Sequence, residues 1–97
     1  MKLKTTYNQY IPNSTTKTLR TGAGEIHAII VTSAVTSAEL VLFYDNTSGS
    51  GNTLLNLYVR DTSPITIFFP PHIPLRFSTG LTVLTPANSR AFVILAY

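Results

Sequence analysis

The sequence predicts an all-β domain, an antiparallel β-sandwich with a jelly-roll-like arrangement of about eight short strands. Two observations predict it. No window places apolar residues at helical spacing together with helix caps and helix formers. Runs rich in Val, Ile, Thr, Tyr and Phe are instead interrupted by Gly, Pro, Asn and Ser, which is typical of strands joined by turns. A chain of 97 residues has room for one such core.

The individual strands follow from these runs in chain order. Residues 45–51 form a polar segment, whose Asx and Gly residues supply the left-handed conformations that close a hairpin. Pro70 and Pro71 lack the N–H that a strand ladder needs, so they mark a sheet edge or a crossing between sheets. We expect one or two strands within residues 5–20, and further strands at residues 25–32, 38–44, 53–60, 64–69, 73–77, 81–84 and 90–97.

The charge divides the chain into two parts. The first twenty residues carry four cations and no acid, whereas the rest carries three arginines against four acids, a net charge of −1. We therefore expect residues 1–21 to form an extended N-terminal arm and residues 22–97 to form the sandwich. The arm residues predicted to bind a partner are Lys2, Lys4, Tyr7, Tyr10, Lys17 and Arg20.

The composition favours association with other protein. Charged residues make up 11 % of the chain, less than half of the roughly 25 % found in soluble domains. Residues 29–31 and 40–43 are apolar on both faces of their strands, so their second face is either half exposed or covered by the N-terminal segment, another subunit or a host surface. The residues predicted to form a subunit interface are Ile29, Val31, Val41 and Phe43.

Few residues can carry chemistry. The chain has no cysteine, and neither His27 nor His72 has a second His or Asp in step with it to complete a metal site. No Ser or Thr stands in a nucleophile motif, and the 45–51 loop has too few acidic oxygens for calcium. We expect no catalytic, cofactor-binding or metal residues. The apolar runs of about six residues are too short to span a membrane.

Four segments of the chain resemble a family of small phage virion proteins. They are GAGEIHAIIV at 22–31, LFYDNTSGSG at 42–51, RFSTGLTV at 76–83 and AFVILAY at 91–97, and the region from residue 22 to 97 is about three quarters of the chain. Similar sequences have a strand with a Gly-rich lead-in, an L-Y-D-x-x-S-x-x-G hairpin, an F-x-x-G-L segment and a final strand ending in Tyr. The resemblance implies a sandwich or jelly-roll unit that decorates or cements capsids, often as a trimer, or that belongs to a tail or fibre.

Together these observations predict a non-enzymatic capsid decoration protein. It would be made in the host cytoplasm, bind the major capsid protein and form a homo-oligomer, with a trimer favoured. The arm would dock on an acidic capsid surface, and its removal would abolish attachment but leave the fold intact. The alternative is a tail or fibre module that binds a receptor or glycan through Tyr44, Tyr58 and the 45–51 loop. Nucleic acid is not expected as a partner, because four cations with two nearby tyrosines make a small basic footprint.

Overall fold

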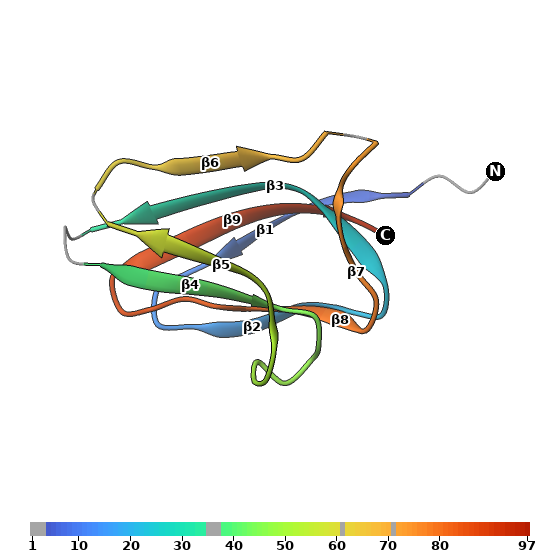
Figure 1. Cartoon of the computed structure of the whole chain (residues 1–97), viewed down its shortest axis with the longest axis horizontal. Coiled ribbons are helices and arrows are strands. Elements are labelled where there is room, and N and C mark those ends of the chain that lie inside the picture. Colours follow the sequence, from blue (N-terminus) through green and yellow to red (C-terminus); the bar gives the residue numbers. More distant parts are fainter. Residues whose placement is uncertain (1–3, 35–37, 61, 71) are drawn as a thin grey trace.

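Strands account for all the regular secondary structure in the part of the chain that the computed structural model describes, which is residues 4–34, 38–60, 62–70 and 72–97. The predicted all-β fold is confirmed (Figure 1). Within the same residues, no helix is long and apolar enough to span a membrane. The strands are β1 (Thr6–Ile11), β2 (Thr16–Thr21), β3 (Gly24–Ser33), β4 (Glu39–Tyr44), β5 (Thr53–Val59), β6 (Ile65–Phe68), β7 (Leu75–Phe77), β8 (Gly80–Leu84) and β9 (Ser89–Ala96).

The strand pairing is nested. β1 pairs with β9, β2 with β8, β3 with β6 and β7, and β4 with β5, all antiparallel, as if one long hairpin had been rolled up. The contacts of β9 with β3 and of β8 with β4 then complete two sheets. Sheet A has the order β1-β9-β3-β6, with β7 also on β3, and sheet B has the order β2-β8-β4-β5. This nested order is the topology of a jelly roll.

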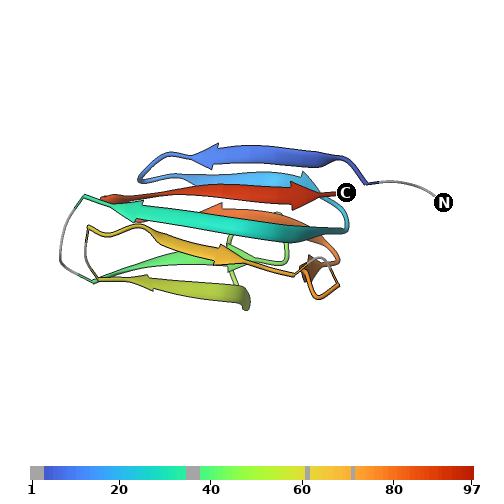
Figure 2. The same ribbon diagram turned by 90° about the horizontal axis from the view of Figure 1, so that it is seen from above.

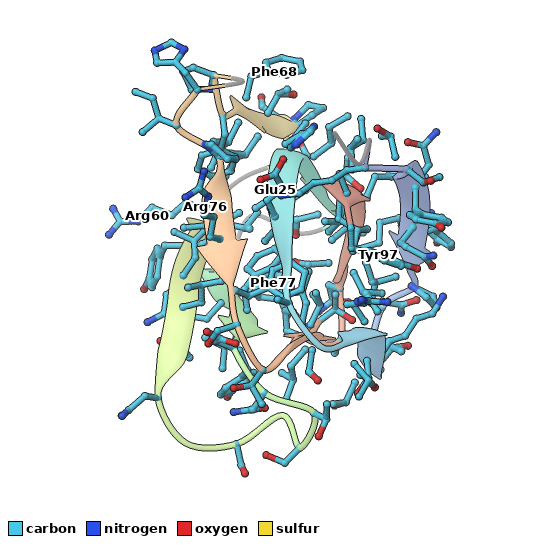
Figure 3. The ribbon with its side chains drawn as sticks, turned by 90° about the vertical axis from the view of Figure 1, so that its right-hand side faces the viewer. Glu25, Arg60, Phe68, Arg76, Phe77 and Tyr97 are labelled. Atoms are coloured by element: carbon cyan, nitrogen blue, oxygen red, sulfur yellow. The ribbon has the colours of Figure 1, made fainter. Side chains whose placement is uncertain are left out.

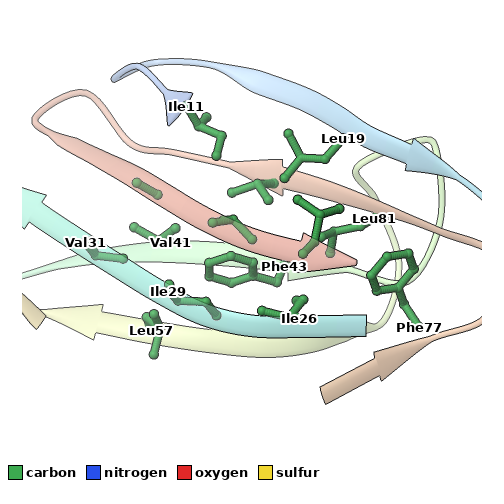
Figure 4. Packing of buried hydrophobic residues seen from close by; sticks show 14 of the residues in the cluster. Ile11, Leu19, Ile26, Ile29, Val31, Val41, Phe43, Leu57, Phe77 and Leu81 are labelled. Atoms are coloured by element: carbon green, nitrogen blue, oxygen red, sulfur yellow. The ribbon is translucent and has the colours of Figure 1, made fainter. Parts of the chain in front are cut away.

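The core lies between the two sheets, whose strands run roughly along the long axis of the molecule (Figure 2). Alternate residues of each strand face inward, so that Ile29 of β3 lies beside Val93 of β9 in sheet A. A bulge between Ile26 and Ala28 shifts the register, and both Ile26 and Ile29 therefore point into the core. Sheet B contributes Val41, Phe43, Leu57, Val59, Leu81 and Val83 (Figure 4).

The expected N-terminal arm is wrong for residues 4–21. β1 is paired with β9 along its whole length, from Thr6 opposite Ala96 to Ile11 opposite Ala91, and β2 is paired with β8. Ile11 and Leu19 are buried in the core (Figure 4). The charges were misleading because the lysines of this region lie outside the core, while the apolar residues between them complete both sheets. Residue 22 therefore stands in the β2–β3 connection and starts no domain.

Two other expectations fall on residues outside the described ranges. Lys2, one of the predicted arm residues, is among residues 1–3, and Pro71 is the second proline of the predicted edge signal. The first proline, Pro70, lies two residues after the end of β6, which is an edge strand of sheet A because it pairs only with β3. The position of Pro70 agrees with the expectation that proline marks a sheet edge.

Candidate binding surfaces

A cleft opens between the two sheets at the end of the sandwich where β1 begins and β9 ends. Figure 3 shows the molecule from this end. Its volume is about 670 Å³. One wall of the cleft consists of residues in or beside β1, β3, β7 and β9 of sheet A. The other wall consists of residues at the ends of β2 and β4 of sheet B. We call it the end cleft, and it is lined by Lys4, Arg20, Ala23, Gly24, Asp45, Arg76, Phe77, Ser78 and Tyr97.

Arg20 is held in the end cleft by two contacts. Its guanidinium carbon lies 3.9 Å from the centre of the Tyr97 ring, and its Nε donates a hydrogen bond to the carbonyl of Ala23 at 3.3 Å. The Tyr7 ring stacks on Tyr97, with the ring centres 4.4 Å apart and the planes 13° from parallel. Because the Arg20 guanidinium and the Tyr7 ring both lie this close to the Tyr97 ring, they must occupy its opposite faces. Within the described residues, Arg20 has no ion pair with an acid.

Gly22 lies in the turn between β2 and β3, beside this guanidinium. It has φ of +110°, a conformation that residues with a side chain rarely adopt. A Cβ at this position would lie 3.5 Å from a terminal nitrogen of Arg20, which is an ordinary van der Waals distance. The turn, and not the placement of Arg20, therefore requires glycine.

Glu25 is the centre of a charged cluster beside the end cleft. Its carboxylate lies 2.9 Å from Nζ of Lys4, 2.8 Å from Nε2 of His27 and 3.9 Å from Nε of Arg76. The hydrogen bonds from His27 and then from Lys4 hold the pKa of Glu25 below its ordinary value, although burial of the carboxyl opposes them. Strand geometry explains the pair with His27, because residues i and i+2 share one face of a strand.

Asp45 fastens the turn between β7 and β8. Its carboxylate accepts hydrogen bonds from the backbone N–H groups of Ser78, Thr79 and Gly80, the shortest at 2.8 Å. Burial raises the pKa of Asp45, but the backbone hydrogen bonds from Thr79, Ser78 and Gly80 outweigh it and leave the pKa lowered. Both acids of this region are therefore engaged with neighbouring groups of the protein.

The structure brings together only some of the residues predicted to bind a partner. Lys4 and Arg20 line the end cleft, and Tyr7 supports it through Tyr97. Tyr10 instead lies on the outside of sheet A, with its ring 4.8 Å from that of Phe92. Nζ of Lys17 is 3.4 Å from the carbonyl of Tyr10, on the same side of the molecule.

Sequence reasoning missed three residues of this region, namely Glu25, Arg76 and Tyr97. They come from separate segments, and they meet because β3 pairs with both β7 and β9. No single motif contains all three, because they lie in the separate segments 22–31, 76–83 and 91–97. The sequence signal for this cluster was limited to Glu25 and His27, which stand two residues apart and therefore lie on the same face of one strand.

The predicted subunit interface is wrong. The four residues proposed for it are fully buried between the sheets, so they cannot contact another subunit. The reason is that strands apolar on both faces do not reveal which set of alternate residues points inward. The residues that face outward are their neighbours, such as Ile30 and Leu40. The buried residues are Ile29, Val31, Val41 and Phe43 (Figure 4).

The outer face of sheet A is apolar and aromatic. The strand register places two rows of side chains across it, and neither row contains a charged residue. Three aromatic side chains are well exposed, with Tyr10 at 41 %, Phe92 at 44 % and Phe68 at 73 %. A shallow groove of about 320 Å³ lies along this face. The rows are Tyr10, Phe92, Ile30 and Thr66, and Asn8, Ile94, Ala28 and Phe68.

The outer face of sheet B is partly covered by the protein itself. The loop after β4 folds over β2 and β8, where Thr82 donates a hydrogen bond to the carbonyl of Asn46 at 2.8 Å and Thr18 donates one to that of Thr47 at 3.4 Å. Thr82 is consequently buried. Tyr44, a candidate glycan contact, is also buried, whereas Tyr58 is half exposed beside Arg60.

The described residues contain no group of three or more His, Asp or Glu side chains placed to hold a metal ion. His72 is exposed, and His27 is engaged with Glu25. Comparisons of the chain with protein-family models, with curated proteins and with solved structures found no match.

Proposed function

We propose that the chain is a non-enzymatic virion structural protein that decorates a phage capsid, and that it contacts the major capsid protein through the outer face of sheet A. The observation that carries the proposal is the pair of uncharged rows on this face, with Tyr10, Phe92 and Phe68 exposed. We name the major capsid protein as the partner because the sequence of residues 22–97 resembles small phage virion proteins.

The chemistry of this face suits a protein interface. The centres of such interfaces are enriched in aromatic residues and depleted of charge. Strand pairing already orders the backbone of this face, so a partner that binds has only side chains to order. A trimer would carry three linked copies of this face, whose contacts with a capsid add by multivalency, so each copy needs only a modest affinity.

Binding to purified capsids tests the proposal. Replacing Tyr10 and Phe92 together by Thr removes both rings from the outer face while keeping good strand formers, and we expect cosedimentation with capsids to be lost. The matched control is Tyr58→Thr, which removes a half-exposed ring from sheet B. If the double variant cosediments like the wild type, or the control loses binding equally, sheet A is not the docking face.

The oligomeric state is a separate part of the proposal. We propose a trimer, as in the proteins that residues 22–97 resemble, and light scattering of the free protein measures it directly. A monomeric mass would contradict the trimer but would not affect the capsid-binding test. A tail or fibre role that binds glycan is less well supported, because Tyr44 is buried and only Tyr58 of the two proposed aromatic contacts is exposed.

A further inference from the structure

The geometry points to the end cleft as a binding site for a small ligand with a single carboxylate group, in which Arg20 grips the carboxylate. This inference does not rest on the proposed function, because the cleft lies at the end of the sandwich and the proposed capsid contact lies on the outer face of sheet A.

The first argument is the preorganisation of Arg20. Its guanidinium is packed against the Tyr97 ring, and its Nε is already bonded to the carbonyl of Ala23. The guanidinium has further N–H donors, and within the described residues none of them makes a hydrogen bond or an ion pair. A positioned guanidinium with free donors loses little entropy when it binds an anion.

The second argument is charge. Within the described residues, no acid forms an ion pair with Arg20. The two acids of this region are held by other groups, because Asp45 accepts three backbone N–H groups and Glu25 is bonded to Lys4 and His27. The carboxylate of a ligand can therefore pair directly with Arg20 without displacing an acid of the protein.

The third argument is shape. A planar guanidinium presents parallel N–H donors that match the two oxygens of a carboxylate. The cleft volume of about 670 Å³ lies in the range of small-molecule sites. Its walls include apolar atoms of Ala23, Phe77 and Tyr97, which can contact an uncharged ligand body. Phe77 and Tyr97 are labelled in Figure 3. Both faces of Tyr97 are occupied by Tyr7 and Arg20, so ligand stacking on that ring is not part of the proposal.

Nuclear magnetic resonance titration of the ¹⁵N-labelled full chain tests this site. We expect glucuronate to shift the amide signals of residues 20–24 and 76–79 saturably. Acetate should shift the same signals with lower affinity, since it lacks the ring body. Glucose, which has the ring but no carboxylate, should leave them unchanged. Inorganic phosphate is the fourth probe, and it should bind more weakly than glucuronate.

Variants separate recognition by Arg20 from general attraction. Arg20→Gln should weaken glucuronate binding at least tenfold, and Arg20→Lys should recover only part of it, since lysine keeps the charge but not the planar fork. Arg76→Gln is a second cleft variant, which should also weaken glucuronate binding, and it should fold because the Arg76 side chain is exposed. Arg90→Gln removes an exposed arginine outside the cleft and should change nothing.

Three outcomes would overturn the inference. They are the absence of saturable shifts with glucuronate, binding of phosphate as tight as that of glucuronate, and an equal loss in Arg20→Gln and Arg90→Gln. Should Arg20→Gln fail to give a dispersed spectrum, Arg20→Lys and Arg76→Gln decide, and unchanged glucuronate affinity in both would overturn the proposal.

Discussion

Gly24 shows how a single residue shapes the end of the sandwich. A Cβ at this position would lie 2.5 Å from Cζ of Phe77 and 3.0 Å from the carbonyl oxygen of Ala96. The absence of a side chain therefore lets the Phe77 ring pack directly on the β3 backbone. Because Phe77 both belongs to the core and lines the end cleft, Gly24 affects the two together.

The first prediction is that Gly24→Ala destabilises the protein. The added methyl group must displace Phe77 or the backbone of β9, and overpacking of this kind costs about 1–3 kcal/mol. Urea denaturation measures the change in the free energy of unfolding. Adding Phe77→Leu to Gly24→Ala relieves the clash, so the costs of the two substitutions should not add. Fully additive costs would show that the Gly24–Phe77 contact is not the cause.

The second prediction concerns Asp45 and acid. The pKa of Asp45 is lower in the folded protein than in the unfolded chain, so the folded state favours the charged carboxylate. Its contribution to stability is thus present above the unfolded pKa and is lost as the pH falls through the folded pKa. A single hydrogen bond to a charged group contributes about 1.5–3 kcal/mol.

Asp45→Asn is the variant that measures this contribution. At neutral pH it should unfold at a lower urea concentration than the wild type, and the difference should shrink as both proteins are acidified. Unfolding curves at several pH values provide the measurement. A difference that stays constant from neutral to acidic pH would mean that the charge of Asp45 does not stabilise the β7–β8 turn.

At the level of strands, β1 and β2 make the N-terminal segment part of the sandwich. Each is an edge strand, β1 of sheet A and β2 of sheet B, and each contributes a buried side chain, Ile11 and Leu19. Edge strands need only one neighbour, so their sequences are less apolar than those of central strands such as β3 and β9. A weakly apolar, basic segment therefore looked like an arm.

The third prediction is that a chain lacking residues 1–21 does not fold. The deletion removes one strand from each sheet and two core side chains, each worth about 1.5–3 kcal/mol, from a fold whose total stability is on the order of 5–15 kcal/mol. Circular dichroism and the dispersion of amide signals report folding. The matched control replaces Lys4 and Lys17 by Gln in the full chain, which removes charge but keeps both strands, and it should fold. A folded truncated chain would restore the arm hypothesis.

Considered as a whole, the molecule has two unequal sides. The loop after β4 covers part of the outer face of sheet B through hydrogen bonds to Thr18 and Thr82, while the outer face of sheet A carries exposed Tyr10, Phe92 and Phe68. The end cleft lies apart from both faces. This separation allows the two proposed interactions, with a protein shell and with a small carboxylate, to be tested independently.

Much of the fold was predictable because strand formation depends on local patterns. From residue 25 onward, apolar runs bounded by turn residues predicted every strand, and each predicted boundary lies within about two residues of the observed one. An example is β5, predicted at 53–60 and observed at Thr53–Val59. The 45–51 loop was correctly predicted to join two strands, β4 and β5. Its packing over sheet B was not visible, because the contacts are with β2 and β8, which are distant in the sequence.

The residues of the two proposed sites depended on tertiary structure. A run such as Ile29-Ile30-Val31 has no polar residue to reveal the inward face, and a shift of one residue exchanges the two faces, so Ile29 and Val31 were assigned to the surface although they are buried. The end cleft exists because Thr6 pairs with Ala96 and Glu25 with Arg76, which places Lys4, Arg20, Arg76 and Tyr97 at one end of the molecule. Local sequence decides which residues become strands, whereas the pairing of distant strands decides which side chains meet.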